Sequence, residues 1–309
     1  MTHAARPLPE VTAIVGPTAA GKSAVAAEVA SALQAEIVAV DAFTIYRGMD
    51  IGTATPADPS VRHHMVDVLE PSSECTAQWF QDRARRAIAE VLGRGRHPLL
   101  VGGSGLYFRA VVDPLEFPPT DPQLRDSLER RHPSPAAAHA ALRAVDPATA
   151  DTVNPGNWRR AIRALEVLEL TGRPFLEWRV AWDDYASCYP GLRVVGIDIT
   201  RDELSDRIVD RVDTMLSAGW VDEATRLRTQ TLSRTAAAAI GYAELWDHLD
   251  GRCTLAQARE RIIIRTRRYA VRQQRWFAAD PRVRWISPAA ATSWLRTGGA
   301  QGSSGVRDS

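Results

Sequence analysis

The sequence is almost without lysine: Lys22 is the only one among 38 lysine and arginine residues. Its net charge is only +1, which excludes a uniformly basic nucleic-acid binder and leaves room for local basic patches. Three cysteines without paired spacing favour buried thiols in a reducing compartment over disulfides or zinc ligands. No apolar run approaches a membrane span, and residues 1–10 lack the apolar core of a signal peptide. We therefore expect a cytoplasmic protein.

The single lysine lies in the pattern G-x-x-x-x-G-K-[ST], between an apolar run (11–15) and a stretch of helix formers (24–33). This pattern aims backbone N–H groups and a helix N-terminus at phosphate oxygens, while the lysine adds a charge and the final hydroxyl can bind Mg²⁺. The alternative is an ordinary glycine-capped turn into a helix. The pattern predicts a phosphate-binding loop formed by Gly16, Pro17, Thr18, Ala19, Ala20, Gly21, Lys22 and Ser23.

Two later apolar runs predict strands that end beside this loop. Residues 36–41 end in Asp41, and residues 98–101 lead into a glycine-rich loop that contains Ser104. In an open parallel sheet the carboxyl ends of the strands share one edge, where ligands bind. The sequence therefore predicts an α/β fold, a parallel sheet flanked by helices, with Asp41 and Ser104 near the phosphate loop.

The composition changes after Val112, where three proline-containing turns follow within ten residues. From there to about residue 190 the pattern is helical only, and a strand pattern returns at residues 194–200. We therefore predict a catalytic core of residues 1–112 and 192–297. A smaller all-helical domain, residues 113–191, is inserted into it, and residues 298–309 form a tail too polar and glycine-rich to fold.

Arginines collect on three predicted helices. The helix at residues 158–170 keeps its arginines off the apolar face, and the helix that begins at Asp202 places Arg207 and Arg211 one turn apart. The helix at residues 254–277 interleaves seven arginines with aromatic residues, a pattern that suits phosphate backbones and base stacking. A solvated surface helix with its isoleucines packed inward fits the last pattern equally well.

These residues alone leave several enzyme classes open, because kinases, nucleotide hydrolases and some transferases share the phosphate loop. Asp41 could hold Mg²⁺ through water, as in a hydrolase, or act as a base. The strand at residues 98–101 ends in Gly-Gly-Ser and supplies no glutamine or glutamate to orient an attacking water. This absence counts against a hydrolase, and a small-molecule kinase remains open.

Seven stretches, in order along residues 11 to about 277, resemble bacterial tRNA dimethylallyltransferases. They are GPTAAGKS (16–23), VDAFTIYRGMDIGT (40–53), HHMVD (63–67), VGGSGLY (101–107), RALEV (163–167), IGY (240–242) and TRRYAVRQ (266–273). Seven ordered matches are far more specific than the phosphate loop alone.

The resemblance implies transfer of a dimethylallyl group from dimethylallyl diphosphate to N6 of the adenosine 3′ of the tRNA anticodon. The phosphate loop would then hold the diphosphate, with Mg²⁺ at Ser23. By the same resemblance Asp41 takes the amine proton, and Arg211 contacts the diphosphate with Arg207 beside it. Ser104 stands where the family usually has threonine, and its hydroxyl could orient the amine or a phosphate oxygen.

The implied partners are dimethylallyl diphosphate and the anticodon stem-loop of tRNA, with no membrane, and we expect a monomer. The implied tRNA-binding residues are Asp41, Ala42, Phe43, Thr44, Ser104, Arg125, Arg159, Arg160, Arg163, Arg267 and Arg268. The sequence departs from the family at Thr55, where lysine is expected, and at Ala238 and Ala243, where polar or basic residues are usual. We expect individual RNA contacts at these three positions to differ from those of the family.

Three other functions remain as alternatives. An isopentenyltransferase acting on free adenine nucleotides would not need the inserted helices. A small-molecule kinase would transfer phosphate from ATP, and a non-catalytic RNA-binding protein would not need Asp41. Adjacent His63 and His64 are expected to form structural hydrogen bonds, because neighbouring residues rarely ligate one metal.

Overall fold

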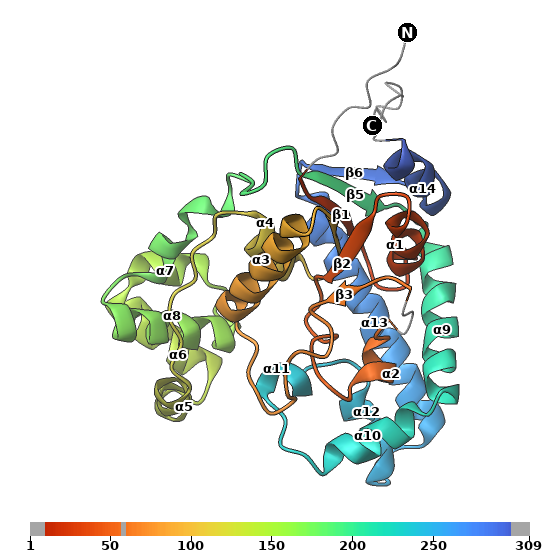
Figure 1. Cartoon of the computed structure of the whole chain (residues 1–309). Helices are drawn as coiled ribbons and strands as arrows, with labels where there is room; N and C mark the ends of the chain where they lie inside the picture. The colour runs from red at the N-terminus through yellow and green to blue at the C-terminus, as the bar shows by residue number, and fades with distance from the viewer. Residues whose placement is uncertain (1–9, 57–59, 298–309) are drawn as a thin grey trace. The chain divides into compact units, whose positions relative to one another are not determined.

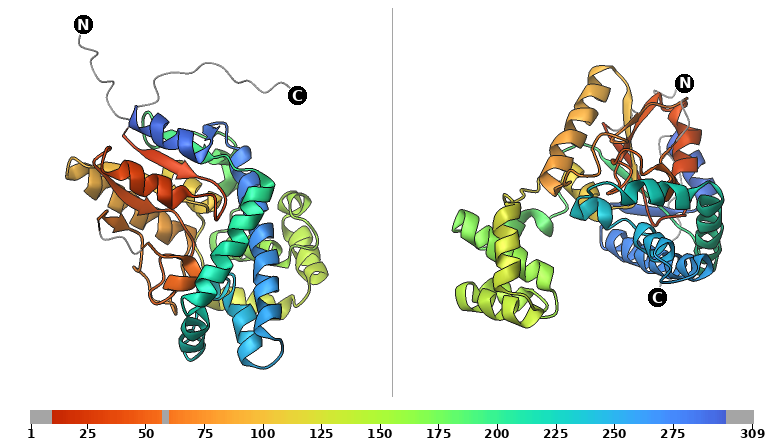
Figure 2. Two further views of the ribbon diagram at one scale, coloured as in Figure 1. Left: turned by 90° about the vertical axis from the view of Figure 1, so that its right-hand side faces the viewer. Right: turned by 90° about the horizontal axis from the view of Figure 1, so that it is seen from below.

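The computed structural model describes residues 10–56 and 60–297 of the 309-residue chain. The chain forms two compact units, one of residues up to Val112 and from Ser187 onward, the other of Asp113–Ala186 (Figures 1 and 2). The second unit thus ends five residues before the position expected from the sequence. The predicted tail at residues 298–309 lies outside the described residues.

The first unit is built on a parallel sheet whose described strands run in the order β3-β2-β4-β1-β5-β6. Short apolar runs form these strands because the sheet is covered on both faces, so alternating polar residues are not required. The strands are β1 (Thr12–Val15), β2 (Ala35–Ala39), β3 (His63–His64), β4 (His97–Gly102), β5 (Arg193–Ile197) and β6 (Val283–Ile286).

Helices cover both faces of this sheet. Figure 1 shows α1 (Lys22–Ala30) and α14 (Pro288–Arg296) on one side of the strands, and α3 (Ala77–Gly93) and α4 (Gly105–Val112) on the other. Two long helices, α9 (Arg201–Ser217) and α13 (Leu255–Ala278), pack side by side (Figure 2). The remaining bounds are α2 (Asp50–Thr53), α10 (Trp220–Arg228), α11 (Arg234–Ala237) and α12 (Tyr242–Leu249). No helix in the described part of the chain is both long and apolar enough to cross a bilayer.

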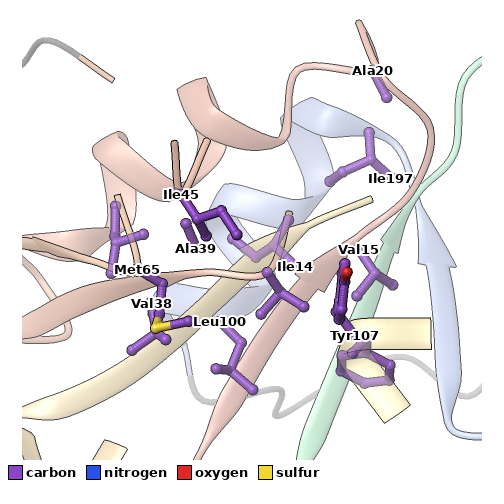
Figure 3. Close-up of a cluster of buried hydrophobic side chains, with 14 of the residues drawn as sticks. Ile14, Val15, Ala20, Val38, Ala39, Ile45, Met65, Leu100, Tyr107 and Ile197 are labelled. Atoms are coloured by element: carbon purple, nitrogen blue, oxygen red, sulfur yellow. The ribbon is translucent and has the colours of Figure 1, made fainter. Parts of the chain in front are cut away.

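The core of this unit lies along the central strands. Ile14, Val38 and Leu100, from β1, β2 and β4, are at most 1% exposed and point into one cluster (Figure 3). Burying each such side chain contributes about 1.5–3 kcal/mol. At the carboxyl end of β4 the strands approach closely, since a Cβ on Gly102 would lie 1.9 Å from the carbonyl oxygen of Val40. Only glycine fits there.

The predicted α/β fold is confirmed, although two strands escaped prediction. β3 has only two residues, too few for a periodic pattern. β6 lies at the edge of the sheet and is partly exposed. Its sequence, Val-Arg-Trp-Ile, is short and follows a long helix, so it was not recognised as a strand. His64 of β3 donates to Glu36 at 2.6 Å and His63 contacts the carbonyl of Val61 at 2.8 Å, so both histidines form the structural hydrogen bonds expected of them.

The second unit is all-helical within its described residues and has its own core, in which Leu128, Leu142 and Ile162 are buried. Four of its helices begin with a side-chain cap and each cap contributes about 1 kcal/mol. Three of them also have proline in the first turn. They are α5 (Pro122–Arg131), α6 (Pro135–Val145), α7 (Pro147–Thr152) and α8 (Trp158–Thr171), followed by the 3₁₀ helix η1 (Phe175–Trp182).

A buried ion cluster holds α5 against α8. Glu166 of α8 is fully buried; its carboxylate accepts three hydrogen bonds from Arg125 at 2.8–3.0 Å and forms an ion pair with Arg163 at 2.8 Å. It also accepts the backbone N–H of Asp121 at 2.8 Å, which anchors the start of α5. Arg163 also donates hydrogen bonds to the carbonyl oxygens of Pro118 and Pro119. Both arginines therefore have a structural role that the sequence reading missed, and their predicted contact with tRNA remains untested.

Replacing Glu166 by glutamine should destabilise the second unit. The variant leaves two guanidinium groups without a counter-charge, which typically costs about 3 kcal/mol or more. We expect the free energy of opening of α8, measured by amide hydrogen exchange, to fall by about that amount. The matched control is Glu169→Gln, which removes the exposed pair with Arg131 and should cost less than about 1 kcal/mol. Equal effects of the two variants would contradict the assignment.

A second buried carboxylate, Glu36 of β2, lies among cations. It accepts hydrogen bonds from Arg94 at 2.7 and 3.2 Å and from His64 at 2.6 Å. The hydrogen bonds from Arg94, followed by those of His64 and opposed by burial, lower the pKa of Glu36 to about 2. A carboxyl with a depressed pKa in the folded state stabilises the fold above its ordinary pKa, and this contribution is lost as the pH falls toward 2.

The acid sensitivity of the fold should therefore depend on Glu36. Between pH 6 and pH 3 the free energy of unfolding should drop by about 2 kcal/mol more in the wild type than in Glu36→Gln, because only the wild type takes up this proton on unfolding. Urea unfolding of both proteins across this range measures the difference. Parallel curves would show that Glu36 is not held ionised by its neighbours.

Candidate active site

The predicted phosphate loop joins β1 to α1. Gly16 has φ +137° and Gly21 has φ +94°, backbone conformations that other residues rarely adopt. Gly21 is the N-cap of α1, which begins at Lys22, so the first turn of that helix leaves its N–H groups pointing out of the sheet edge. Glycines at these two positions let the chain turn sharply before a helix N-terminus, which is the geometry that holds phosphate groups.

Lys22 lies inside the curl of this loop and is half-buried. Its Nζ donates to the carbonyl oxygen of Pro17 at 2.6 Å, so the loop encloses the ammonium group. Burial, followed by repulsion from Arg211 and opposed by Asp41, lowers the pKa of Lys22 to about 8. An anion bound in the loop would favour the charged form and raise this pKa again.

Asp41 follows β2 and faces the same space. Its Oδ1 accepts the backbone N–H of Phe43 at 2.9 Å, which turns the chain away from the sheet edge and leaves the carboxylate beside the loop. Its charge acts on Lys22, on Arg211 and on the half-buried phenol of Tyr269, whose pKa is raised by burial and then by Asp41. Asp41 is thus the acidic group of the site.

Arg207 and Arg211 approach from α9. Arg207 donates to the carbonyl oxygen of Ala20 in the phosphate loop at 3.4 Å and pairs with Glu203 at 2.5 Å. Arg211 donates to the carbonyl oxygen of Thr53 at 3.5 Å, and burial lowers its pKa. Arg207 therefore lies against the loop, whereas Arg211 contacts α2 and acts on Lys22 through its charge.

These groups line a cavity of about 550 Å³ within the first unit. Polar and charged lining residues include Thr18, Lys22, Ser23, Asp41, Arg207 and Arg211. Apolar lining residues from α9, α10 and the segment before α12 include Val212, Met215, Trp220, Ala239 and Ile240. A cavity with a charged part and an apolar part suits a ligand that carries both an anionic and a hydrocarbon group.

The structure separates the other predicted site residues into three groups. Phe43 and Thr44 line the cavity with Asp41, whereas Ala42 and Ser104 are not among the lining residues, although Gly103 is. Arg159 and Arg160 are exposed on α8 of the second unit, and Arg125 and Arg163 are paired with Glu166. Arg268 is exposed on α13 and Arg267 is half-buried there.

Sequence reasoning missed one support of the site, Glu223 of α10. Its buried carboxylate accepts the N–H groups of Ile51 and Gly52 at 2.8 and 2.9 Å and the hydroxyl of Tyr242 at 2.8 Å. It therefore holds α2, whose Thr53 lines the cavity. The only available signal was an acidic residue in the first turn of a helix, which is too common to identify such a role.

Comparisons with known proteins agree with this geometry. A profile of the family described as IPP transferase matches residues 44–280, and one described as isopentenyl transferase matches residues 9–65. A tRNA dimethylallyltransferase from Nocardioides sp. is 48% identical over 283 residues, covering 89% of this chain and 90% of that protein. Another from Streptomyces coelicolor is 46% identical over 294 residues and covers 93% of each chain.

Solved structures of similar proteins support the same family assignment. The full-length tRNA isopentenylpyrophosphate transferase from Bacillus halodurans matches with a TM-score of 0.66 and 37% identity, covering 93% of this chain and 94% of that one. A eukaryotic dimethylallyltransferase acting on tRNA, at 23% identity and a TM-score of 0.76, shares the fold and covers 92% of this chain and 75% of that one. Because the family profile covers most of the sequence and the relatives align over nearly all of it, this chain belongs to the IPP transferase family.

Proposed function

We propose that this protein transfers the dimethylallyl group of dimethylallyl diphosphate to N6 of the adenosine 3′ of the anticodon in tRNA. The observation that carries the proposal is the phosphate loop and the Asp41 carboxylate lining one cavity that also has apolar walls. The names of the relatives support the choice of a tRNA substrate. Residues 1–112 and 187–297 would supply the chemistry, and the second unit would grip the anticodon arm.

The reaction needs a base and an acceptor of negative charge. As the adenine nitrogen bonds to the allylic carbon, the carbon–oxygen bond to diphosphate breaks and the amine loses a proton. Asp41 takes that proton, because it is the cavity's carboxylate and lies beside the loop. Lys22, Arg211 and the loop N–H groups stabilise the departing diphosphate.

The donors in the site also fit Mg²⁺. The Ser23 hydroxyl is exposed beside Lys22 at the start of α1, and Mg²⁺ prefers such oxygen donors together with substrate phosphates and water. Within the described residues no group of three or more His, Cys, Asp or Glu could hold a metal ion, so we assign no all-protein site. When bound, the ion would neutralise charge on the diphosphate.

The tRNA contact on α13 involves the C-terminal half of that helix. In the N-terminal half, Arg259, Arg261 and Arg265 pair with Asp213, Asp247 and Glu244. In the C-terminal half, Arg268 and Arg275 have no acidic partner among the described residues. Their charges are therefore available for RNA phosphates.

The activity is tested with labelled dimethylallyl diphosphate offered to anticodon stem-loop RNA, to AMP or to neither. We expect label in the RNA with release of diphosphate. Asp41→Asn should lower turnover by roughly 10²–10⁴, because asparagine still accepts the Phe43 N–H but takes no proton. RNA binding should not change.

The matched control is Asp210→Asn, the same substitution at an exposed site on α9, which should leave turnover unchanged. Label in AMP alone would indicate a nucleotide isopentenyltransferase. Phosphate transfer from ATP would indicate a kinase, and unchanged turnover in Asp41→Asn would remove this residue from the mechanism.

Two arginines of α13 offer a direct test of the RNA contact. Arg268→Ala should weaken stem-loop binding and reduce the slope of log affinity against log salt by about 0.7–0.9, the loss of one phosphate contact. Arg261→Ala, on the same helix but paired with Asp247, should change the slope by less than half as much. Fluorescence titrations at several salt concentrations measure both slopes, and equal slopes would refute the division of the helix.

A further inference from the structure

Gln273 of α13 is buried at the edge of the cavity and uses both ends of its amide. Its Oε1 accepts the backbone N–H of Thr18 at 2.8 Å, and its Nε2 donates to the carbonyl oxygen of Gly103 at 2.9 Å. The side chain is about 5% exposed. Because one partner is a donor and the other an acceptor, a neutral amide is the one common side chain of this length that satisfies both.

The two partners belong to the two loops that form the site. Thr18 lies in the phosphate loop after β1, and Gly103 lies in the glycine-rich loop after β4, the strand next to β1. The packing is tight, since a Cβ on Gly103 would lie 2.2 Å from the Gln273 Nε2 and 3.0 Å from the carbonyl oxygen of Gly16. Gln273 therefore ties the two loops at the point where they nearly touch.

The helix that carries Gln273 lines the cavity and also carries exposed arginines. Thr266, Tyr269 and Gln273 fall on one stripe of α13, and all three line the cavity. Arg268 and Arg275 are exposed on the same helix. One rigid element thus contacts the diphosphate loop with one face and presents cations on another.

We propose that Gln273 is a positioning residue for group transfer. It holds the phosphate loop at the distance from the adenine amine that the reaction requires. The inference rests on the proposed function, in which the loop holds diphosphate. Gln273 itself bonds to backbone groups and not to the reacting atoms. An error of about 1 Å in the position of the loop is enough to lower turnover by about 10².

Two variants separate positioning from packing. Gln273→Met keeps the volume and removes both hydrogen bonds. Gln273→Glu keeps the length and the bond from Thr18 but turns a second acceptor toward the Gly103 carbonyl. Gln274→Glu, at the half-buried neighbouring position, introduces the same charge as a control.

For both Gln273 variants we expect kcat to fall 10- to 100-fold and the Kd for inorganic diphosphate, measured by calorimetry with magnesium chloride, to rise about tenfold. The Kd for anticodon stem-loop RNA should stay within twofold of wild type. Gln274→Glu should match the wild type in all three measurements.

Wild-type kcat in both variants would overturn the proposal, and so would a loss of RNA affinity equal to the loss of diphosphate affinity. Failure of both variants to fold would also overturn it, because the two hydrogen bonds of Gln273 would then serve stability alone. The proposed function fails separately if the wild type neither binds diphosphate nor prenylates the stem-loop.

Discussion

The parallel register of β2, β4 and β1 is the constraint on which the site depends. β4 lies between β2, which Asp41 follows, and β1, which leads into the phosphate loop, so the axes of β2 and β1 stand about 10 Å apart. β4 ends in Gly102 and is followed by Gly103, and neither residue places a side chain between them. A base and an anion site can therefore face one cavity from opposite sides.

The charges in that cavity complement an anionic leaving group. Lys22 and Arg211 repel each other and lose hydration, and both effects lower the pKa of Lys22, while Asp41 partly offsets them. A diphosphate would supply the missing negative charge and relieve the repulsion. The unfavourable burial of two cations therefore increases the affinity of the site for diphosphate, the leaving group.

Elsewhere in the chain some arginines neutralise buried carboxylates and others remain exposed. Arg125 and Arg163 neutralise the buried Glu166; Arg125 joins α5 to α8, and Arg163 joins α8 to the backbone of residues 118–119. Arg268 has no such partner within the described residues and remains available to an external anion. Arginine serves both purposes because its planar group forms several directed bonds and stays charged when partly buried. The number of basic residues in the sequence therefore exceeds the number that can bind nucleic acid, because some of them pair with acidic neighbours.

Local chemistry in the sequence predicted a glycine turn between a strand and a helix and a second strand just before Asp41, and the structure contains both. Glycine spacing reports backbone conformation directly, and parallel strands bring their carboxyl ends to one edge. The roles of Gln273 and Glu223 were decided only by the tertiary structure. The bond from Thr18 to Gln273 joins positions 255 residues apart, and Glu223 caps a helix 171 residues earlier. Neither residue has a local pattern that distinguishes it, because a buried amide or carboxylate acquires its role from the partners that folding brings to it.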